Sequence, residues 1–110
     1  MIANTPEPPY YAVIFTNIQT CDLQGYEEMA NRMLELAQQQ PGYLGFESAR
    51  NGLGIAVSYW KDEESILAWK KQLDHQLAQR NGRNKWYADY CTRIAKVERA
   101  YSKDTSPMSS

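Results

Sequence analysis

The sequence predicts a single α+β domain whose elements follow the order β-α-β-β-α-β. Two stretches with apolar residues every three or four positions indicate helices, and four runs rich in β-branched and aromatic residues indicate strands. The chain has 110 residues, enough for one domain with a modest core. We expect the folded domain to span residues 10–101, with a flexible arm at residues 1–9 and a disordered tail at residues 102–110.

A strand and a helix open the domain. Residues 10–19 carry apolar side chains on both faces, as in a strand that is covered on both sides. Asp22 then offers an N-cap, and Pro41-Gly42 offers a helix end. Between them, the helical spacing of one apolar stripe predicts a helix, with the members Tyr26, Met29, Ala30, Met33, Leu34 and Ala37.

A β-hairpin is expected next, from residues 43–50 and 54–60. Asn51-Gly52 between them suits a two-residue type I′ turn, in which both central residues have positive φ. The strand at residues 54–60 again carries bulky side chains on both of its faces. This strand is therefore also expected to be covered on both sides.

A second helix and a last strand complete the domain. Asp62 offers the N-cap, and the apolar stripe of the helix consists of Ile66, Trp69, Leu73 and Leu77. Asn81-Gly82 is expected to end the helix. One further helical turn is expected at residues 84–90, and the last strand at residues 91–101.

This order of elements is that of the ferredoxin-like split βαβ fold, an antiparallel sheet with helices on one face. The first and third strands are apolar on the other face too, and an apolar sheet face needs a cover. The same face of a second copy is the simplest cover. We therefore expect a homodimer through the sheet faces, which gives a dimeric α/β barrel.

Composition argues against several classes of partner and site. The formal net charge is −1, so no positive excess is present to bind nucleic acid or an anionic membrane. The sequence contains no apolar run of transmembrane length and no secretion signal at its N-terminus. Cys21 and Cys91 stand isolated, which predicts two free thiols, a cytoplasmic protein and no metal site.

Aromatic residues are frequent, and such rings line ligand pockets as well as cores. We expect a pocket between helices and sheet, with Asn17, Trp69 and His75 as candidate catalytic residues. Each has a structural alternative: Asn17 can start a loop, Trp69 can be a core residue, and His75 lies on the surface unless its helix is kinked. The expected substrate-binding walls are Phe15, Tyr59, Trp86 and Tyr90.

Four segments, in order, resemble the antibiotic biosynthesis monooxygenase (ABM) family across residues 10–101. They are Phe15-Thr16-Asn17, Gln40-Pro41-Gly42-Tyr43-Leu44-Gly45, Ser58-Tyr59-Trp60-Lys61-Asp62-Glu63-Glu64, and Ala68-Trp69 with His75. The resemblance implies a dimeric ferredoxin-like barrel with a hydrophobic pocket in each subunit. Family members include cofactor-independent oxygenases that turn polycyclic phenols into quinones, enzymes that open the haem ring, and many without known activity.

The family's functional residues match this sequence in part. Quinone-forming members use an Asn, a Trp and a Tyr along the second helix, at positions occupied here by Ser65, Trp69 and His75. Haem-degrading members use a first-strand Asn, which Asn17 matches, and a Trp followed ten positions later by an axial His. That last position is Gln79 here, so the histidine stands about one helical turn from the expected place.

The resemblance implies an oxygenase that oxidises a small aromatic or polycyclic compound with O2, without metal or flavin. In this role Trp69 orients the ring, His75 accepts a proton and Asn17 hydrogen-bonds an oxygen. Two alternatives stay open. One is haem degradation, with haem as ligand or substrate, and the other is a non-catalytic dimeric module that binds a small hydrophobic molecule.

Overall fold

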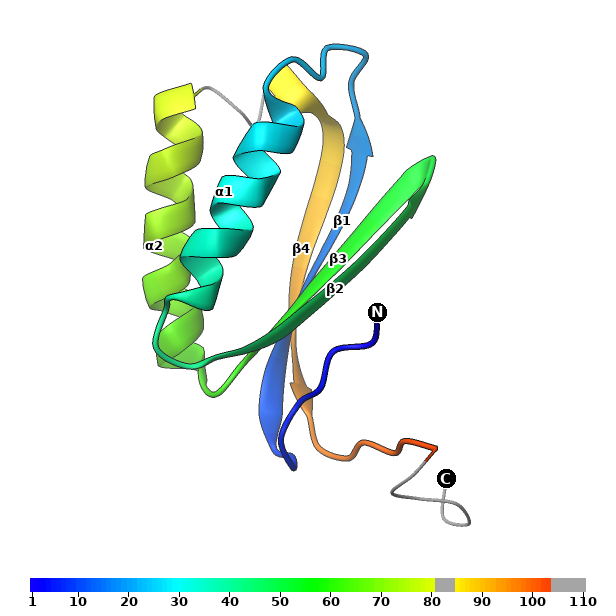
Figure 1. The fold of residues 1–110 in the computed structure, drawn as a ribbon, viewed down its shortest axis with the longest axis vertical. Coiled ribbons are helices and arrows are strands. Elements are labelled where there is room, and N and C mark those ends of the chain that lie inside the picture. Colours follow the sequence, from blue (N-terminus) through cyan, green and yellow to red (C-terminus); the bar gives the residue numbers. More distant parts are fainter. Residues whose placement is uncertain (81–84, 104–110) are drawn as a thin grey trace.

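The computed structural model describes residues 1–80 and 85–103, and for residues 77–80 it describes the backbone alone. The elements follow the predicted order: β1 (Tyr10–Gln19), α1 (Tyr26–Gln38), β2 (Tyr43–Asn51), β3 (Leu53–Trp60), α2 (Glu63–Arg80) and β4 (Tyr87–Val97). The strands form one antiparallel sheet in the order β2-β3-β1-β4. Both helices cover the same face of this sheet (Figure 1). The predicted ferredoxin-like α+β fold is confirmed.

The start of α2 follows the prediction closely. Asp62 Oδ1 accepts hydrogen bonds from the backbone N–H of Ser65 at 2.8 Å and from its hydroxyl at 2.6 Å. These bonds hold the pKa of Asp62 below its usual value, since they stabilise the charged carboxylate. Within the predicted stripe, Ile66 and Trp69 are buried and Leu73 packs against the core. The side chain of Leu77 and the predicted break at Asn81-Gly82 lie outside the described residues.

The start of α1 differs from the prediction. The N-cap is Gly25, with φ of 80°, and no side chain caps the helix. Asp22 instead accepts a hydrogen bond from the N–H of Gln24 at 3.4 Å, in the turn before the helix. Ala30 is exposed, and the buried face of α1 consists of Met29, Met33, Leu36 and Ala37. The predicted stripe shares Met29, Met33 and Ala37 with the buried face, but it includes Ala30 and omits Leu36. It is therefore rotated slightly around the helix.

The last strand begins and ends earlier than predicted. β4 spans Tyr87–Val97, so residues 87–90 are strand and not a helical turn. Its length follows from β1, because Tyr10 pairs with Val97 and Gln19 pairs with Tyr87. The backbone N–H of Thr20 also donates to the Trp86 carbonyl at 2.8 Å, which holds the start of β4.

The hairpin between β2 and β3 lies where predicted, but in a different register. Asn51 pairs with Leu53, so Gly52 stands alone at the tip with φ of 78°. A two-residue turn would pair Arg50 with Leu53, whereas Arg50 pairs with Gly54. This register places Arg50 beside Gly54, which has no side chain.

Tryptophan rings fill much of the space between the helices and the sheet. Trp60, Trp69 and Trp86 are all buried. The rings of Trp60 and Trp69 stack with centroids 5.9 Å apart and planes inclined by 23°. The indole N–H of Trp86 donates to the carbonyl of Gln24 at 3.0 Å, which ties the residue before β4 to the turn before α1. The core is therefore built on aromatic packing.

Within the residues that the structure describes, the sheet face opposite the helices, here called the open face, is covered at one end only. There the backbone N–H of Ala3 donates to Glu47 Oε2 at 2.9 Å. The hydroxyls of Thr5 and Tyr10 share a hydrogen bond at 2.8 Å, so the N-terminal arm lies against this face. At the other end, three large apolar side chains are exposed: Ile18, Leu53 and Ile55.

Candidate functional site

One row of paired residues crosses the sheet and carries the polar part of the candidate site. Arg50 of β2 lies opposite Gly54 of β3, Gly54 opposite Asn17 of β1, and Asn17 opposite Tyr90 of β4. Side chains alternate along β1, so Asn17 shares a face with Val13, which packs against the core. The row therefore lies on the helix-covered face of the sheet.

Asn17 is 3% exposed although it carries a polar amide. Its Oδ1 accepts a hydrogen bond from Nη2 of Arg50. Because a guanidinium only donates, this bond turns the amide oxygen toward Arg50 and the amide N–H groups away from it. Gly54 makes room for the contact, since a Cβ there would collide with the guanidinium and lie 2.6 Å from Nη1. Gly54 is thus needed for space, not for an unusual backbone angle.

An aromatic cluster adjoins this row and consists of Phe15, Tyr26, Trp86, Tyr87 and Tyr90. Phe15 lies with its ring centroid 5.1 Å from that of Tyr87 and 5.7 Å from that of Tyr90. Tyr26 of α1 packs edge to face on Trp86 at 5.8 Å and on Tyr87 at 6.0 Å. The cluster joins β1, α1 and β4, and it gives the polar row an apolar neighbour.

Tyr87 is a phenol of the aromatic cluster whose pKa departs from its usual value. Burial raises the pKa of Tyr87 well above its usual value, and the hydrogen bond with Tyr26 adds to this effect. The positive charge of Arg50 acts in the opposite direction, but its effect is smaller than that of burial and of Tyr26. Tyr87 therefore keeps its proton at neutral pH and serves as a hydrogen-bonding group, not as a base.

Four predicted site residues come together, and the other three, Trp69, Tyr59 and His75, do not join them. Phe15, Asn17, Trp86 and Tyr90 belong to the polar row or the aromatic cluster. Trp69 is a core residue stacked on Trp60. Tyr59 was expected to line the same pocket, but it lies on the open face, where its hydroxyl donates to Glu47 at 2.5 Å. Burial and this contact raise the pKa of Tyr59 to about 12.

His75 is exposed on α2, which runs unbroken through it from Glu63 to Arg80. The helical spacing from Leu73 predicts this placement, because two residues correspond to about 200° around the helix. In the single chain, His75 therefore points away from the face that carries Ile66 and Trp69.

Sequence reasoning missed Arg50, Gly54 and Tyr26. The available signal was Gly54, since a glycine inside a strand often marks the close approach of another group. Arg50 follows from Gly54 only when the register of the hairpin is known.

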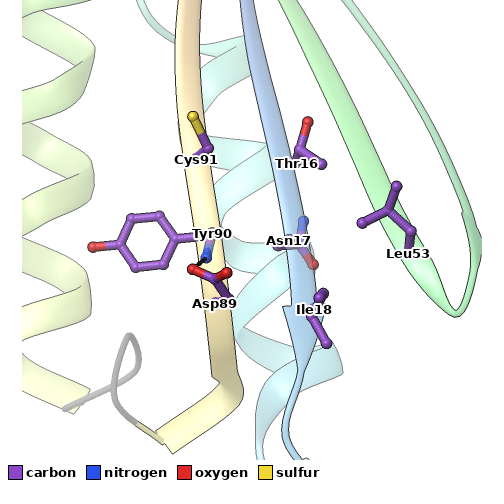
Figure 2. A pocket seen from close by; sticks show the side chains of 7 residues that line it. All are labelled: Thr16, Asn17, Ile18, Leu53, Asp89, Tyr90 and Cys91. Atoms are coloured by element: carbon purple, nitrogen blue, oxygen red, sulfur yellow. Dashed lines mark hydrogen bonds between the residues drawn. The ribbon is translucent and has the colours of Figure 1, made fainter.

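A shallow hollow of about 140 Å³ lies on the other side of the same strands (Figure 2). Its lining comprises Thr16, Asn17, Ile18, Leu53, Asp89, Tyr90 and Cys91. Figure 2 shows the Tyr90 ring extending away from Leu53. By strand alternation, five of these residues, all except Asn17 and Tyr90, belong to the open face. The sheet backbone therefore separates the hollow from the aromatic cluster.

Three further observations apply to the part of the chain that the structure describes. In it, no three His, Cys, Asp or Glu side chains gather in a way that could hold a metal ion. Cys21 and Cys91 are free and exposed. Neither helix in residues 1–80 and 85–103 has the length and apolar character needed to cross a lipid bilayer.

The fold and this site define a ferredoxin-like protein with an aromatic cluster and a buried amide under its helices. The model of the family "Antibiotic biosynthesis monooxygenase" matches residues 9–81, and the chain belongs to this family. It is 49% identical over 100 residues to the protein YqjZ of Bacillus subtilis (strain 168), covering 89% of this chain and 88% of that protein.

Two further similarities extend the comparison. Over 92 residues the chain is 35% identical to the jasmonate monooxygenase ABM of Pyricularia oryzae (strain 70-15), covering 79% of this chain and 43% of that protein. The chain thus spans less than half of this second relative. The crystal structure of PA3566 from Pseudomonas aeruginosa superposes with a TM-score of 0.65 at 13% identity, covering 87% of this chain and 99% of that one. This last likeness is one of fold.

Proposed function

We propose that the chain is an oxygenase that oxidises a small aromatic or other hydrophobic compound with O2, without metal or flavin. The observation that carries this proposal is the buried amide of Asn17, oriented by Arg50 at the edge of the aromatic cluster. Membership of the family and the monooxygenase name of the Pyricularia oryzae relative support the same class of reaction.

The reaction needs few catalytic groups from the protein, because the substrate anion itself reduces O2. The substrate loses a proton, and the resulting electron-rich anion transfers one electron to O2. The two radicals combine into a peroxide anion, which takes up the proton released in the first step and then loses water, so that a CH2 group and O2 give a carbonyl group and H2O. A protein promotes this sequence when it holds the anion in a dry apolar setting and donates hydrogen bonds to its oxygen.

The site residues have distinct roles in this proposal. The aromatic cluster holds the apolar body of the substrate, and the amide N–H groups of Asn17 donate to the oxygen on which negative charge develops. His75 has no part in it, because it is exposed on α2, and Trp69 is a core residue stacked on Trp60.

Oxygen uptake with a panel of phenols and anthrones, measured with a chelator and without flavin, tests this function. We expect uptake with at least one compound, and Asn17→Leu is expected to lower kcat/KM on the order of 100-fold, the effect of one lost donor to a developing oxyanion. Tyr59→Phe, on the open face, is the matched control and should keep the wild-type rate. Tight binding of a compound without any uptake would favour the non-catalytic binding module instead.

We also propose a homodimer through the open face. Its support is the exposed apolar end of that face, formed by Ile18, Leu53 and Ile55, which the N-terminal arm leaves uncovered. Contiguous apolar surface of this kind favours a partner, and the same face of a second copy matches it by symmetry.

The dimer is testable by sedimentation with one charged substitution. We expect a species of about twice the chain mass of 12.7 kDa at micromolar concentration. Ile55→Glu should produce the monomer, because a carboxylate would be buried without a partner in the interface. Leu67→Glu is the matched control, since Leu67 is 61% exposed on α2 and far from this face. A wild-type mass of 12.7 kDa would contradict the proposal.

The location proposed for the protein is the cytoplasm. Its support is the pair of exposed free thiols, Cys21 and Cys91, since such thiols persist most readily in a reducing compartment.

A further inference from the structure

We infer that Arg50 makes this site selective for a hydrophobic carboxylate, whose apolar body packs on the aromatic cluster and whose charged group binds the guanidinium. The inference rests on the proposed function for the location of the site. It concerns the class of ligand and not the oxygen chemistry, so the two are tested separately.

The position of Arg50 is held from several sides. Nη2 donates to Asn17, and Nη1 donates to the carbonyl of Gly52 at 3.4 Å. The absence of a side chain at Gly54 lets the guanidinium lie across β3 toward β1. A guanidinium has five N–H donors, so these two bonds leave donors for a ligand. The group is thus both positioned and able to bind.

The charge of Arg50 has no carboxylate partner within the residues that the structure describes. The arginine and lysine ion pairs found there are Arg32 with Glu35 and Lys70 with Asp74, both on helices. The side chain bonded to the guanidinium is the neutral amide of Asn17, and Phe15 lies two residues before Asn17 on the same face of β1. A fixed positive charge beside apolar rings is complementary to an amphipathic anion.

The exposure of the row indicates how such a ligand would lie. Arg50 is exposed, whereas Asn17 is buried. A charged group bound to Arg50 therefore stays in contact with water and avoids the large desolvation penalty of a buried ion pair. The apolar body extends inward to Phe15 and Tyr87, which favours a ligand with one charged end.

A carboxylate fits this arrangement better than a phenolate. Its two oxygens match the planar guanidinium through two parallel hydrogen bonds, whereas a phenolate offers one oxygen. A simple phenol also has a pKa of about 10 and is neutral at pH 7, so it would first have to lose its proton.

The experiment compares two probes of the same shape, 2-naphthoate and 2-naphthamide, by calorimetric titration at pH 7 in the absence of O2. We expect the wild-type protein to bind the carboxylate at least about 10-fold more tightly than the amide, as for a charge-assisted hydrogen-bonded pair. Arg50→Gln should abolish this preference. Arg50→Lys should keep part of it, because the charge remains and the fork is lost. Gly54→Ala should reduce it, because a Cβ displaces the guanidinium.

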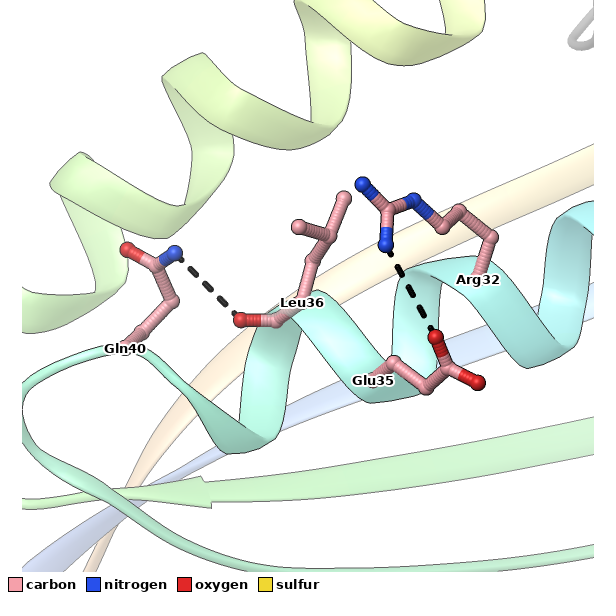
Figure 3. Close-up of polar contacts among 4 residues, drawn as sticks. All are labelled: Arg32, Glu35, Leu36 and Gln40. Carbon is pink, nitrogen blue, oxygen red and sulfur yellow. Dashed lines mark hydrogen bonds and ion pairs between the residues drawn. The ribbon is translucent and has the colours of Figure 1, made fainter.

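Arg32→Gln is the matched control, because Arg32 pairs with Glu35 on the surface of α1 at 3.7 Å (Figure 3). This variant should keep the full preference, and circular dichroism shows whether each variant is folded. The inference is overturned if the wild-type protein shows no preference, including the case in which neither probe binds. It is equally overturned if Arg50→Gln keeps the preference, or if 2-naphthol binds more tightly than 2-naphthoate. A protein that takes up no oxygen can still prefer the carboxylate, and a protein that takes up oxygen can lack this preference. The proposed function and this inference therefore fail separately.

Discussion

Trp60→Ala is expected to lower the free energy of unfolding by about 3–5 kcal/mol, the usual loss for a large buried aromatic side chain. Trp60 is fully buried at the end of β3. Its ring stacks on Trp69 at 5.9 Å and meets Tyr43 edge to face at 5.7 Å, and its indole N–H donates to Ser58 Oγ at 2.8 Å. A domain of this size has a total stability of about 5–15 kcal/mol, so the variant should be largely unfolded in mild denaturant.

Urea unfolding followed by circular dichroism measures this loss. Leu67→Ala provides the comparison, because Leu67 is a large apolar residue that is 61% exposed on α2. Its substitution is expected to change the free energy of unfolding by no more than about 0.5 kcal/mol. Similar losses in the two variants would show that Trp60 is not the centre of the core.

The elements that depend on local interactions were predictable from the sequence. The N-cap of α2 involves Asp62 and Ser65, three residues apart, and both are visible in the sequence. The turn at Gly42 and the hairpin tip at Gly52 each depend on a single glycine with positive φ. Local signals of this kind, together with the spacing of apolar residues, are sufficient for the order of elements and hence for the fold.

The boundaries that depend on distant residues were not predictable in this way. β4 begins where its pairing with β1 begins, and the contact between Thr20 and Trp86 joins residues far apart in sequence. The N-cap of α1 is Gly25 and not Asp22, and the indole of Trp86 bonds to Gln24 just before it. Such contacts form only when the chain has folded, so local sequence propensity does not predict the boundaries that depend on them.

The candidate site depends on register, which explains why only part of it was predicted. With a two-residue turn, Gly54 would lie opposite Ala49, and the contact between Arg50 and Asn17 would not arise. One residue of slip changes every cross-strand neighbour. By contrast, helix periodicity alone placed His75 on the exposed side of α2, since it depends only on residues within the same helix.

Gly42→Ala is the second substitution expected to destabilise the protein strongly, for two separable reasons. Gly42 has a φ of +86°, where a residue with a Cβ is strained by about 1–2 kcal/mol. A Cβ there would also collide with the hydroxyl oxygen of Ser65 and lie 2.6 Å from its Cβ. Displacing Ser65 breaks its hydrogen bonds to Asp62 at the start of α2, so the loss should clearly exceed the strain alone.

Two comparisons separate these reasons when the free energy of unfolding is measured in urea. Gly52→Ala is the control for strain, because Gly52 has a φ of +78° and a Cβ there would meet nothing within 4 Å. It should lose only about 1–2 kcal/mol. In a Ser65→Gly background the collision partner is gone, so Gly42→Ala should fall to a similar loss. An equal loss from Gly42→Ala with and without the Ser65 side chain would show that the turn at Gly42 does not approach the start of α2 as described. A smaller loss in the Ser65→Gly background would show that the turn before β2 lies close against the start of α2 at this point.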